Sequence, residues 1–189
     1  MRLPERGLRI DLGGLGKGYC ADSVVRALRE RNVNSALIAI AGDIYALGRR
    51  PDGAAWRIGV QDPRYPDDPS RQLTVLALTD KAVSTSGNYQ RFVEIQGRRY
   101  SHIIDPRTGQ AADNVPSVTV IGPDTLTTDI LGTALSVMGV DEGLTLVETL
   151  PSVEAMFVVF DKGTNPLITR SSGFAAYEVG RDSETDYRK

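Results

Sequence analysis

The sequence has very few of the residues from which soft metal sites, disulfides and general bases are built. Among 189 residues there is one cysteine, Cys20, and one histidine, His102. A single cysteine excludes an internal disulfide, and one cysteine with one histidine cannot supply the nitrogen and sulfur ligands of a usual zinc site. Any bound metal is therefore expected to be a hard cation with oxygen ligands. An imidazole has an unperturbed pKa of about 6.5, near neutral pH, which suits a general base. Because His102 is the only histidine, any imidazole base must be His102.

Long apolar runs and an excess of basic residues are also missing. No stretch approaches the roughly 20 apolar residues of a membrane span, and residues 1–6 lack the apolar segment of a secretory signal. The chain has 22 Lys and Arg and 24 Asp and Glu, which gives a formal net charge of −2, and both signs are scattered along the sequence. Without a basic stripe to neutralise phosphates, we expect no nucleic-acid binding. The length and the 41% hydrophobic content fit one sizeable globular domain.

The spacing of apolar residues predicts a β-rich chain with two or three helices. Predicted strands cover residues 8–12, 36–40, 44–47, 56–60, 73–78, 82–85, 92–95, 100–104, 117–121, 153–160 and 166–169. Predicted helices cover residues 19–31, 125–138, the latter capped by Asp124, and 141–149. Hairpins dominate and regular strand–helix–strand alternation is missing. The pattern predicts an α+β fold, with a mostly antiparallel sheet and the helices packed on it.

A glycine-rich loop at residues 13–18 lies between a predicted strand and a predicted helix. Backbone N–H groups in such a loop favour anions, and Lys17 adds a positive charge, so the loop could hold a phosphate. The common templates fit poorly. A P-loop needs Ser or Thr where this chain has Gly18, and the relaxed dinucleotide fingerprint at residues 16–21 lacks its usual alternating context. A plain strand-to-helix turn explains the glycines equally well.

Two further candidates come from spacing and position. Asp129 and Thr133 lie four residues apart, so on a helix both could reach one hard cation. The alternative, which spacing alone favours, is that Asp129 simply lies near a helix start, where the dipole stabilises acids. His102 precedes a predicted turn at residues 105–109 and could equally be a base or a hydrogen-bonded core histidine. Ser86 is a weak nucleophile candidate, because a hydrolase elbow needs glycine two residues earlier.

Four segments together resemble the ApbE family, whose members are FAD:protein FMN transferases. They are DLGGLGKGY at 11–19, TSGNY at 85–89, HIIDPRTG at 102–109 and TDILGTA at 128–134. The likeness runs from about Ile10 to Tyr177 and includes residues 41–43 and 56–60. We therefore expect one flavin-transferase-like domain over residues 10–180 and a polar tail over 181–189. Family members are usually longer, so the chain is expected to match their C-terminal part, without the N-terminal portion.

The resemblance implies transfer of FMN from FAD to a Thr or Ser hydroxyl of a partner flavoprotein, with release of AMP and with Mg²⁺ as the metal. Carried over by position, Asp11, Lys17 and Ile103 would contact FAD. His102 would take the proton from the acceptor hydroxyl. The relatives' location suggests a periplasmic protein, or one anchored to the membrane and facing the periplasm.

The remaining site residues also follow from the resemblance. The main-chain oxygen of Gly14 would hold the metal together with Asp129 and Thr133, which agrees with the hard ligands expected from composition. The residues assigned to the architecture of the flavin site are Ser86, Gly87 and Tyr89. Two alternatives stay open: an FAD- and Mg²⁺-binding module without turnover, and a Mg²⁺-dependent FAD pyrophosphatase giving FMN and AMP.

Overall fold

The computed structural model describes Gly7 and residues 10–87, 92–95, 98–113, 115–161 and 165–180, with the backbone alone for residues 92–95 and 98–100. Its helices are α1 (Gly16–Glu30), α2 (Thr125–Met138), α3 (Val140–Val147) and the 3-10 helix η1 (Phe174–Tyr177). Its strands are β1 (Ala36–Ile40), β2 (Asp43–Leu47), β3 (Trp56–Gln61), β4 (Gln72–Leu78), β5 (Lys81–Gly87), β6 (Phe92–Ile95), β7 (Arg98–Ser101), β8 (Ile104–Asp105), β9 (Gln110–Ala111), β10 (Ser117–Gly122), β11 (Glu154–Phe160), β12 (Pro166–Arg170) and β13 (Glu178–Val179).

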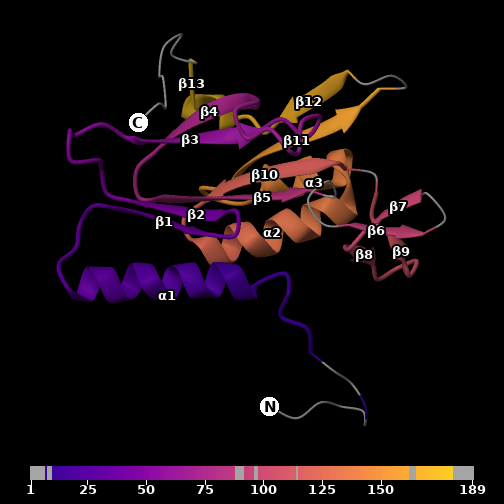
Figure 1. The fold of residues 1–189 in the computed structure, drawn as a ribbon, viewed down its shortest axis with the longest axis horizontal. Coiled ribbons are helices and arrows are strands. Elements are labelled where there is room, and N and C mark those ends of the chain that lie inside the picture. Colours follow the sequence, from indigo (N-terminus) through magenta and orange to yellow (C-terminus); the bar gives the residue numbers. More distant parts are fainter. Residues whose placement is uncertain are drawn as a thin grey trace.

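Three layers make up the fold (Figure 1). The middle layer is a six-stranded sheet in the order β1-β2-β5-β10-β11-β12, and each neighbouring pair is antiparallel. The α-helices cover one face of this sheet, and the antiparallel sheet β13-β4-β3 covers the other. Two small hairpins, β6-β7 and β8-β9, extend from one end. The α+β class with a mostly antiparallel sheet is confirmed.

The central strands of the middle sheet are buried on both faces because both faces are covered. All six residues of β10 are buried, and side chains alternate between the faces of a strand. Val118 and Val120 belong to a cluster with Leu135 of α2, on the helix side. Ile121 packs with Leu76 of β4, on the side of the small sheet. The apolar run of β11 is likewise a two-sided strand, whereas the apolar run of β1, at the edge of the sheet, exposes Leu37.

The predicted strand at residues 8–12 is wrong where the structure describes it. Residues 10–12 lie in no strand, and the Leu12 carbonyl accepts hydrogen bonds from the amides of Leu15 (3.1 Å) and Gly16 (2.8 Å). These bonds wind the chain directly into α1, which begins at Gly16 rather than at residue 19. The glycine-rich segment is thus partly the first turn of a helix.

The predicted strand 100–104 is divided between two hairpins. Its first part pairs with β6, and Ile104 pairs with Ala111 in the β8-β9 hairpin. The predicted turn at 105–109 closes this second hairpin, because the Gly109 amide donates to the Asp105 carbonyl at 2.8 Å. Gly109 has a φ of 71°, which a glycine adopts without strain. The break leaves His102 between the two hairpins.

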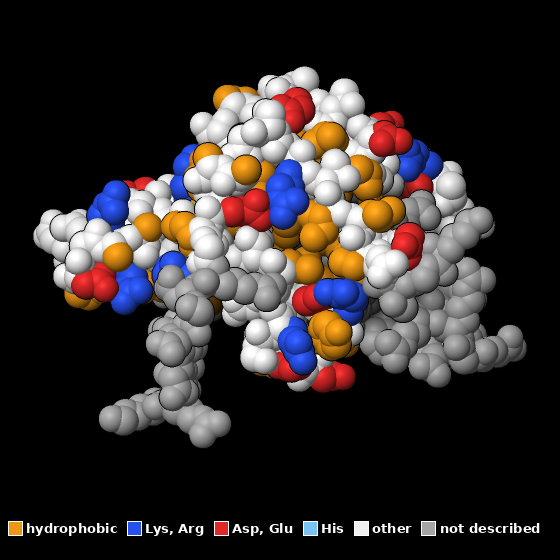
Figure 2. All heavy atoms as spheres, turned by 90° about the horizontal axis from the view of Figure 1, so that it is seen from above, with side chains coloured by type: hydrophobic (Ala, Val, Ile, Leu, Met, Phe, Trp, Pro, Cys, Tyr) orange, Lys and Arg blue, Asp and Glu red, His pale blue; other side chains and the backbone are white. Residues whose placement is uncertain are grey.

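The surface carries both signs of charge. On the face shown in Figure 2, acidic and basic side chains of the described residues are interspersed rather than gathered by sign. Arg170 and Glu178 illustrate this mixing with an ion pair of 3.0 Å between β12 and β13. Within the described ranges, no helix has both the length and the apolar character needed to cross a membrane.

Candidate functional site

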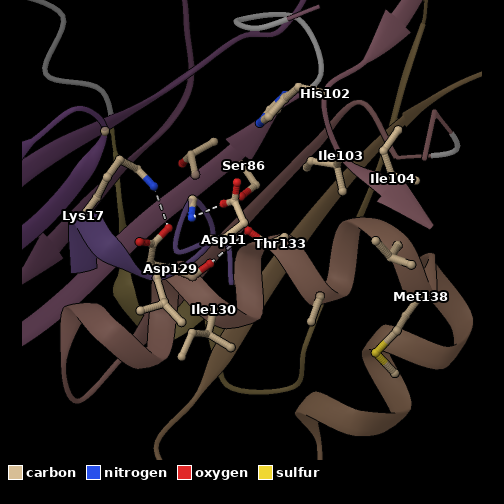
Figure 3. Close-up of a pocket in the computed structure, with 18 of the residues that line it drawn as sticks. Asp11, Lys17, Ser86, His102, Ile103, Ile104, Asp129, Ile130, Thr133 and Met138 are labelled. Carbon is tan, nitrogen blue, oxygen red and sulfur yellow. Dashed lines mark hydrogen bonds and ion pairs between the residues drawn. The ribbon is translucent and has the colours of Figure 1, made fainter. Parts of the chain in front are cut away.

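A large open pocket of about 1390 Å³ lies where the start of α1, the end of β5, the His102 segment and one face of α2 meet (Figure 3). Nine of the residues selected from the sequence line it: Asp11, Gly14, Lys17, Ser86, Gly87, His102, Ile103, Asp129 and Thr133. Tyr89 lies outside the described residues. Segments more than 100 residues apart in the sequence therefore converge on one cavity.

The glycine-rich loop forms one wall of this pocket. Asp11 Oδ1 accepts a hydrogen bond from the Gly13 amide at 2.6 Å, a local turn that fixes the loop. Gly18 lets α1 lie directly against the beginning of α2, because a Cβ there would be 2.5 Å from the Thr125 carbonyl oxygen. At least this glycine has a packing role. A plain turn does not account for Gly18, because it follows the turn, inside the helix.

Lys17 lies between two buried carboxylates. Its Nζ donates to Asp129 Oδ1 at 2.7 Å and is 3.2 Å from Asp43 Oδ2. The side chains of both aspartates are 4% exposed, against 33% for Lys17. Asp129 Oδ2 in turn accepts from the Gly18 amide at 2.9 Å. Figure 3 shows Lys17 directed at Asp129 along the edge of the pocket.

Burial and charge act together on this group of three. Burial raises the pKa of Asp43 above its ordinary value, and the neighbouring Asp129 charge adds to that, against opposing effects of Ser84 and Lys17. Burial lowers the pKa of Lys17, but the hydrogen bond to Asp129 and the two carboxylate charges outweigh it, so this pKa is raised. The single Lys17 ammonium thus pairs with both carboxylates, and the group of three keeps a net negative charge.

Oxygen atoms suited to a hard cation gather beside Asp129. A Cβ on Gly14 would lie 3.3 Å from Thr133 Oγ1, so the loop backbone runs next to that hydroxyl. Thr133 Oγ1 donates a long, 3.4 Å hydrogen bond to the Asp129 carbonyl. In the described part of the chain, no three His, Cys, Asp or Glu residues cluster as a metal site. A cation here would need the carboxylate, the hydroxyl and a carbonyl, which fit Mg²⁺, and the Lys17 ammonium shows that a cation is stable at Asp129.

The beginning of α2 explains why Asp129 is more than an acid near a helix dipole. Asp124 caps the helix through the Thr127 amide at 2.7 Å, as predicted. Asp22 of α1 accepts from the amides of Thr125 (2.8 Å) and Leu126 (2.9 Å). These two aspartates already accept hydrogen bonds from the first free amides of α2. Asp129 instead turns toward α1, and the simple dipole interpretation is wrong.

The opposite side of the pocket is more exposed. His102 is exposed between buried Ser101 and buried Ile103. The Ile103 amide donates to Ser101 Oγ at 3.1 Å, and its carbonyl accepts from the Ala112 amide at 2.8 Å, which fixes the backbone beside the histidine. In Figure 3, His102 and α2 lie on opposite sides of the pocket. The interpretation of His102 as a core histidine is therefore wrong.

Ser86 closes the pocket between β5 and α2. A Cβ on Gly132 would lie 2.8 Å from Ser86 Oγ, so the serine packs directly on the helix backbone. Gly87 ends β5 beside it, opposite Ser117 in β10. Both residues line the cavity, and their assignment to the architecture of a flavin site stays a prediction.

Sequence reasoning missed Asp43 and Asp22 as site-forming residues. Asp43 follows a tight turn in which Ala41 and Gly42 have φ values of 47° and 97°. That turn between two apolar strands was visible in the sequence, but its carboxylate's burial was not. Asp22 lies on the same helix as Lys17, and its partners are 103 and 104 residues away.

Comparison with known proteins agrees with these motifs. The chain matches the family model described as "ApbE family" over residues 1–157. It is 37% identical over 171 residues to a Treponema pallidum protein named FAD:protein FMN transferase, covering 86% of this chain and 47% of that protein. A Klebsiella pneumoniae protein of the same name is 38% identical over 157 residues, covering 82% and 47%. The chain thus spans about half the length of the curated relatives it matches.

Solved structures share the fold. The Thermotoga maritima ApbE protein superimposes with a TM-score of 0.81 at 35% identity, over 93% of this chain and 55% of that one. The Pseudomonas stutzeri flavinyl transferase ApbE, in its apo form, gives a TM-score of 0.76 at 38% identity, over 90% and 52%. The family match over most of the chain, the identities and the shared fold lead to one conclusion: this chain belongs to the ApbE family.

Proposed function

We propose that this chain forms the pocket of an FAD:protein FMN transferase, which moves FMN from FAD to a Thr or Ser hydroxyl of an acceptor flavoprotein and releases AMP in a Mg²⁺-dependent reaction. The observation that supports this best is the convergence of residues from all four family motifs on one cavity. The names of the relatives add to it.

The start of α1 is suited to the pyrophosphate of FAD. No acidic residue lies in the first turn of this helix, and its N-cap residue Leu15 makes no side-chain cap. Of the first-turn amides, the Gly18 amide already donates to Asp129. Helix N-termini and glycine-rich loops attract anions. A bound Mg²⁺ would offset the negative charge that remains around Lys17, Asp43 and Asp129. The end of α2 and the His102 segment contribute apolar lining from Ile103, Val137 and Met138, which suits the flavin ring.

The proposed metal ligands are the Asp129 carboxylate, the Thr133 hydroxyl and the Gly14 carbonyl. When bound, Mg²⁺ would polarise the phosphoryl oxygens and offset charge on the departing AMP. The residues of the chain orient this chemistry: the bond from the Gly18 amide holds the Asp129 carboxylate in one position. Positioning and charge neutralisation account for most of the catalysis of phosphoryl transfer.

His102 is proposed to take the proton of the acceptor hydroxyl. The hydroxyl oxygen bonds to the phosphorus of the FMN half, the bond from that phosphorus to the bridging oxygen breaks, and AMP leaves with the electron pair. The Thr or Ser that gives up this proton belongs to another protein, so the base must be accessible from outside. The exposure of His102 at the pocket edge meets this requirement.

Incubation of the chain with FAD, MgCl₂ and an acceptor domain tests the proposal. In-gel fluorescence of the acceptor after denaturation is expected, and its absence at every enzyme concentration would contradict transfer by this chain. Chromatography of a reaction without acceptor separates the alternatives. FMN and AMP released there would support the pyrophosphatase, with water in place of the hydroxyl. FAD binding with neither product would support the module without turnover.

A further inference from the structure

Asp43 is a buried carboxylate without an evident structural role. It begins β2, is 3% exposed, and does not line the pocket. Within the described residues its Oδ2 accepts no hydrogen bond and forms an ion pair with Lys17 Nζ, while Ser84 bonds to the same carboxyl and Asp129 adds a like charge nearby. Burying a carboxylate is costly unless it is paired and hydrogen-bonded. Because Asp43 Oδ2 lacks a hydrogen bond, we expect a group that bonds to it in another state of the site.

Both oxygens of the Asp129 carboxylate are already engaged. Oδ2 accepts from the Gly18 amide and Oδ1 accepts from Lys17 Nζ at 2.7 Å. The proposed function makes Asp129 a ligand of a divalent cation. A cation that coordinates Oδ1 competes with the ammonium for that oxygen, because two cationic groups on one oxygen repel each other at contact distance.

The geometry offers the displaced ammonium a place to go. Lys17 Nζ is 3.2 Å from Asp43 Oδ2, so a shift of a few tenths of an ångström turns a loose ion pair into a full charge-assisted hydrogen bond. Such a shift needs only a change in the flexible lysine side chain, while Gly18 and Asp129 keep the helices in place.

We propose that Lys17 and a divalent cation compete for Asp129 Oδ1, and that Asp43 relieves this competition by receiving the Lys17 ammonium when the cation binds. Asp43 is then a positioning residue that acts through Lys17. The inference rests on the proposed function only for the choice of Asp129 as a cation ligand, and it does not depend on the transfer reaction.

A double-mutant cycle on cation binding tests the inference. Mn²⁺ is titrated into the chain without FAD and followed by EPR, so the readout is independent of activity. Lys17→Met removes the competitor and is expected to tighten Mn²⁺ binding. Asp43→Asn leaves Lys17 held by Asp129 alone and is expected to weaken binding on the order of tenfold, within the range for coupled neighbours.

The decisive comparison is Asp43→Asn in the Lys17→Met background. If Asp43 acts through Lys17, its substitution changes Mn²⁺ affinity there by less than about twofold, since the pair no longer exists. An undiminished loss would overturn the inference, because Asp43 would then act by its own charge. Mn²⁺ binding that Lys17→Met leaves unchanged would also overturn it. So would the absence of Mn²⁺ binding in both the unmodified chain and Lys17→Met.

A matched control is available away from the pocket. Asp62 is another buried carboxylate, paired with Arg64. Asp62→Asn is expected to leave Mn²⁺ affinity unchanged, which separates the Lys17 effect from a general cost of removing a buried charge. Loss of coupling with FMN transfer intact would count against the inference alone. Coupling without any FMN transfer would support the inference and count against the proposed function.

Discussion

The two sides of the pocket are built in opposite ways. On the side of α1 and α2, Asp43 and Asp129 are each 3% exposed. Without any ligand, Asp43 already pairs with Lys17 and Asp129 already accepts from the Gly18 amide. On the side of the His102 segment, Ile104 is 53% exposed and the Arg107 side chain is 58% exposed. A low-dielectric, prearranged group of charges suits phosphate and metal chemistry. An exposed rim suits a protein acceptor, which must reach the same centre from outside.

The largest expected effect comes from breaking the buried side at Asp129. Asp129→Ala leaves Lys17 and the Gly18 amide without their partner and removes the proposed metal ligand. We expect FMN transfer to fall by about 10³-fold, with Mg²⁺ and FAD binding weakened together. Steady-state rates at varied Mg²⁺ measure this. Asp129→Asn, which preserves shape, isolates the charge, and an unchanged Mg²⁺ dependence would contradict the ligand assignment.

The next effect comes from the exposed side. His102→Ala is expected to lower kcat by about 10²- to 10⁴-fold, as for loss of a general base, while FAD binding stays within a few-fold. Thermal melting should be unchanged because the side chain is exposed. An equal loss of FAD binding, or a marked fall in Tm, would show that His102 has a structural role.

A smaller effect is expected where the two helices are joined. Asp22→Ala removes the acceptor of two α2 amides and should lower the free energy of unfolding by about 1–3 kcal/mol. Urea denaturation measures it. Ser23→Ala, at the next position of α1, removes a hydroxyl that donates to the Tyr19 carbonyl within the same helix. It is the control and should stay within about 0.5 kcal/mol. Equal effects of the two substitutions would show that Asp22 does not join the helices.

The smallest effect should lie away from both sides. The hydroxyl and amide of Ser172 donate to Glu148 and hold its pKa below the ordinary 4.5. A lowered folded-state pKa contributes stability that is present above the unfolded pKa and is lost as pH falls through the folded value. Glu148→Gln should therefore make unfolding less dependent on pH below 4.5. Thermal melts from pH 3 to 7 test this, and an unchanged slope would contradict it.

Local chemistry made much of the fold and part of the site predictable. The cap at Asp124 and the strands of the middle sheet follow from turn residues and apolar runs. Asp129 and Thr133 could be paired as candidates because helical spacing is local. The strand predicted at residues 8–12 failed because a short apolar segment is extended only when a neighbour pairs with it. The start of α1 was missed because Gly18 is a poor helix former, placed there by its contact with Thr125.

The long-range pairings could not be predicted from the sequence alone. Lys17 and Asp129 are 112 residues apart, and no spacing rule connects them. Asp43 is of a residue type common in turns. Only the register of β2 against β5, which pairs it with Ser84, places its carboxylate in the protein interior. Charges that meet through sheet topology become visible only when the sheet is assembled.

The most direct test is the intact mass of an acceptor flavoprotein after incubation with this chain, FAD and MgCl₂. Transfer predicts a mass increase equal to FMN minus water, located on one Thr or Ser, with an equal amount of AMP released. An acceptor of unchanged mass, with FAD either intact or cleaved to free FMN and AMP, would contradict transfer by this chain.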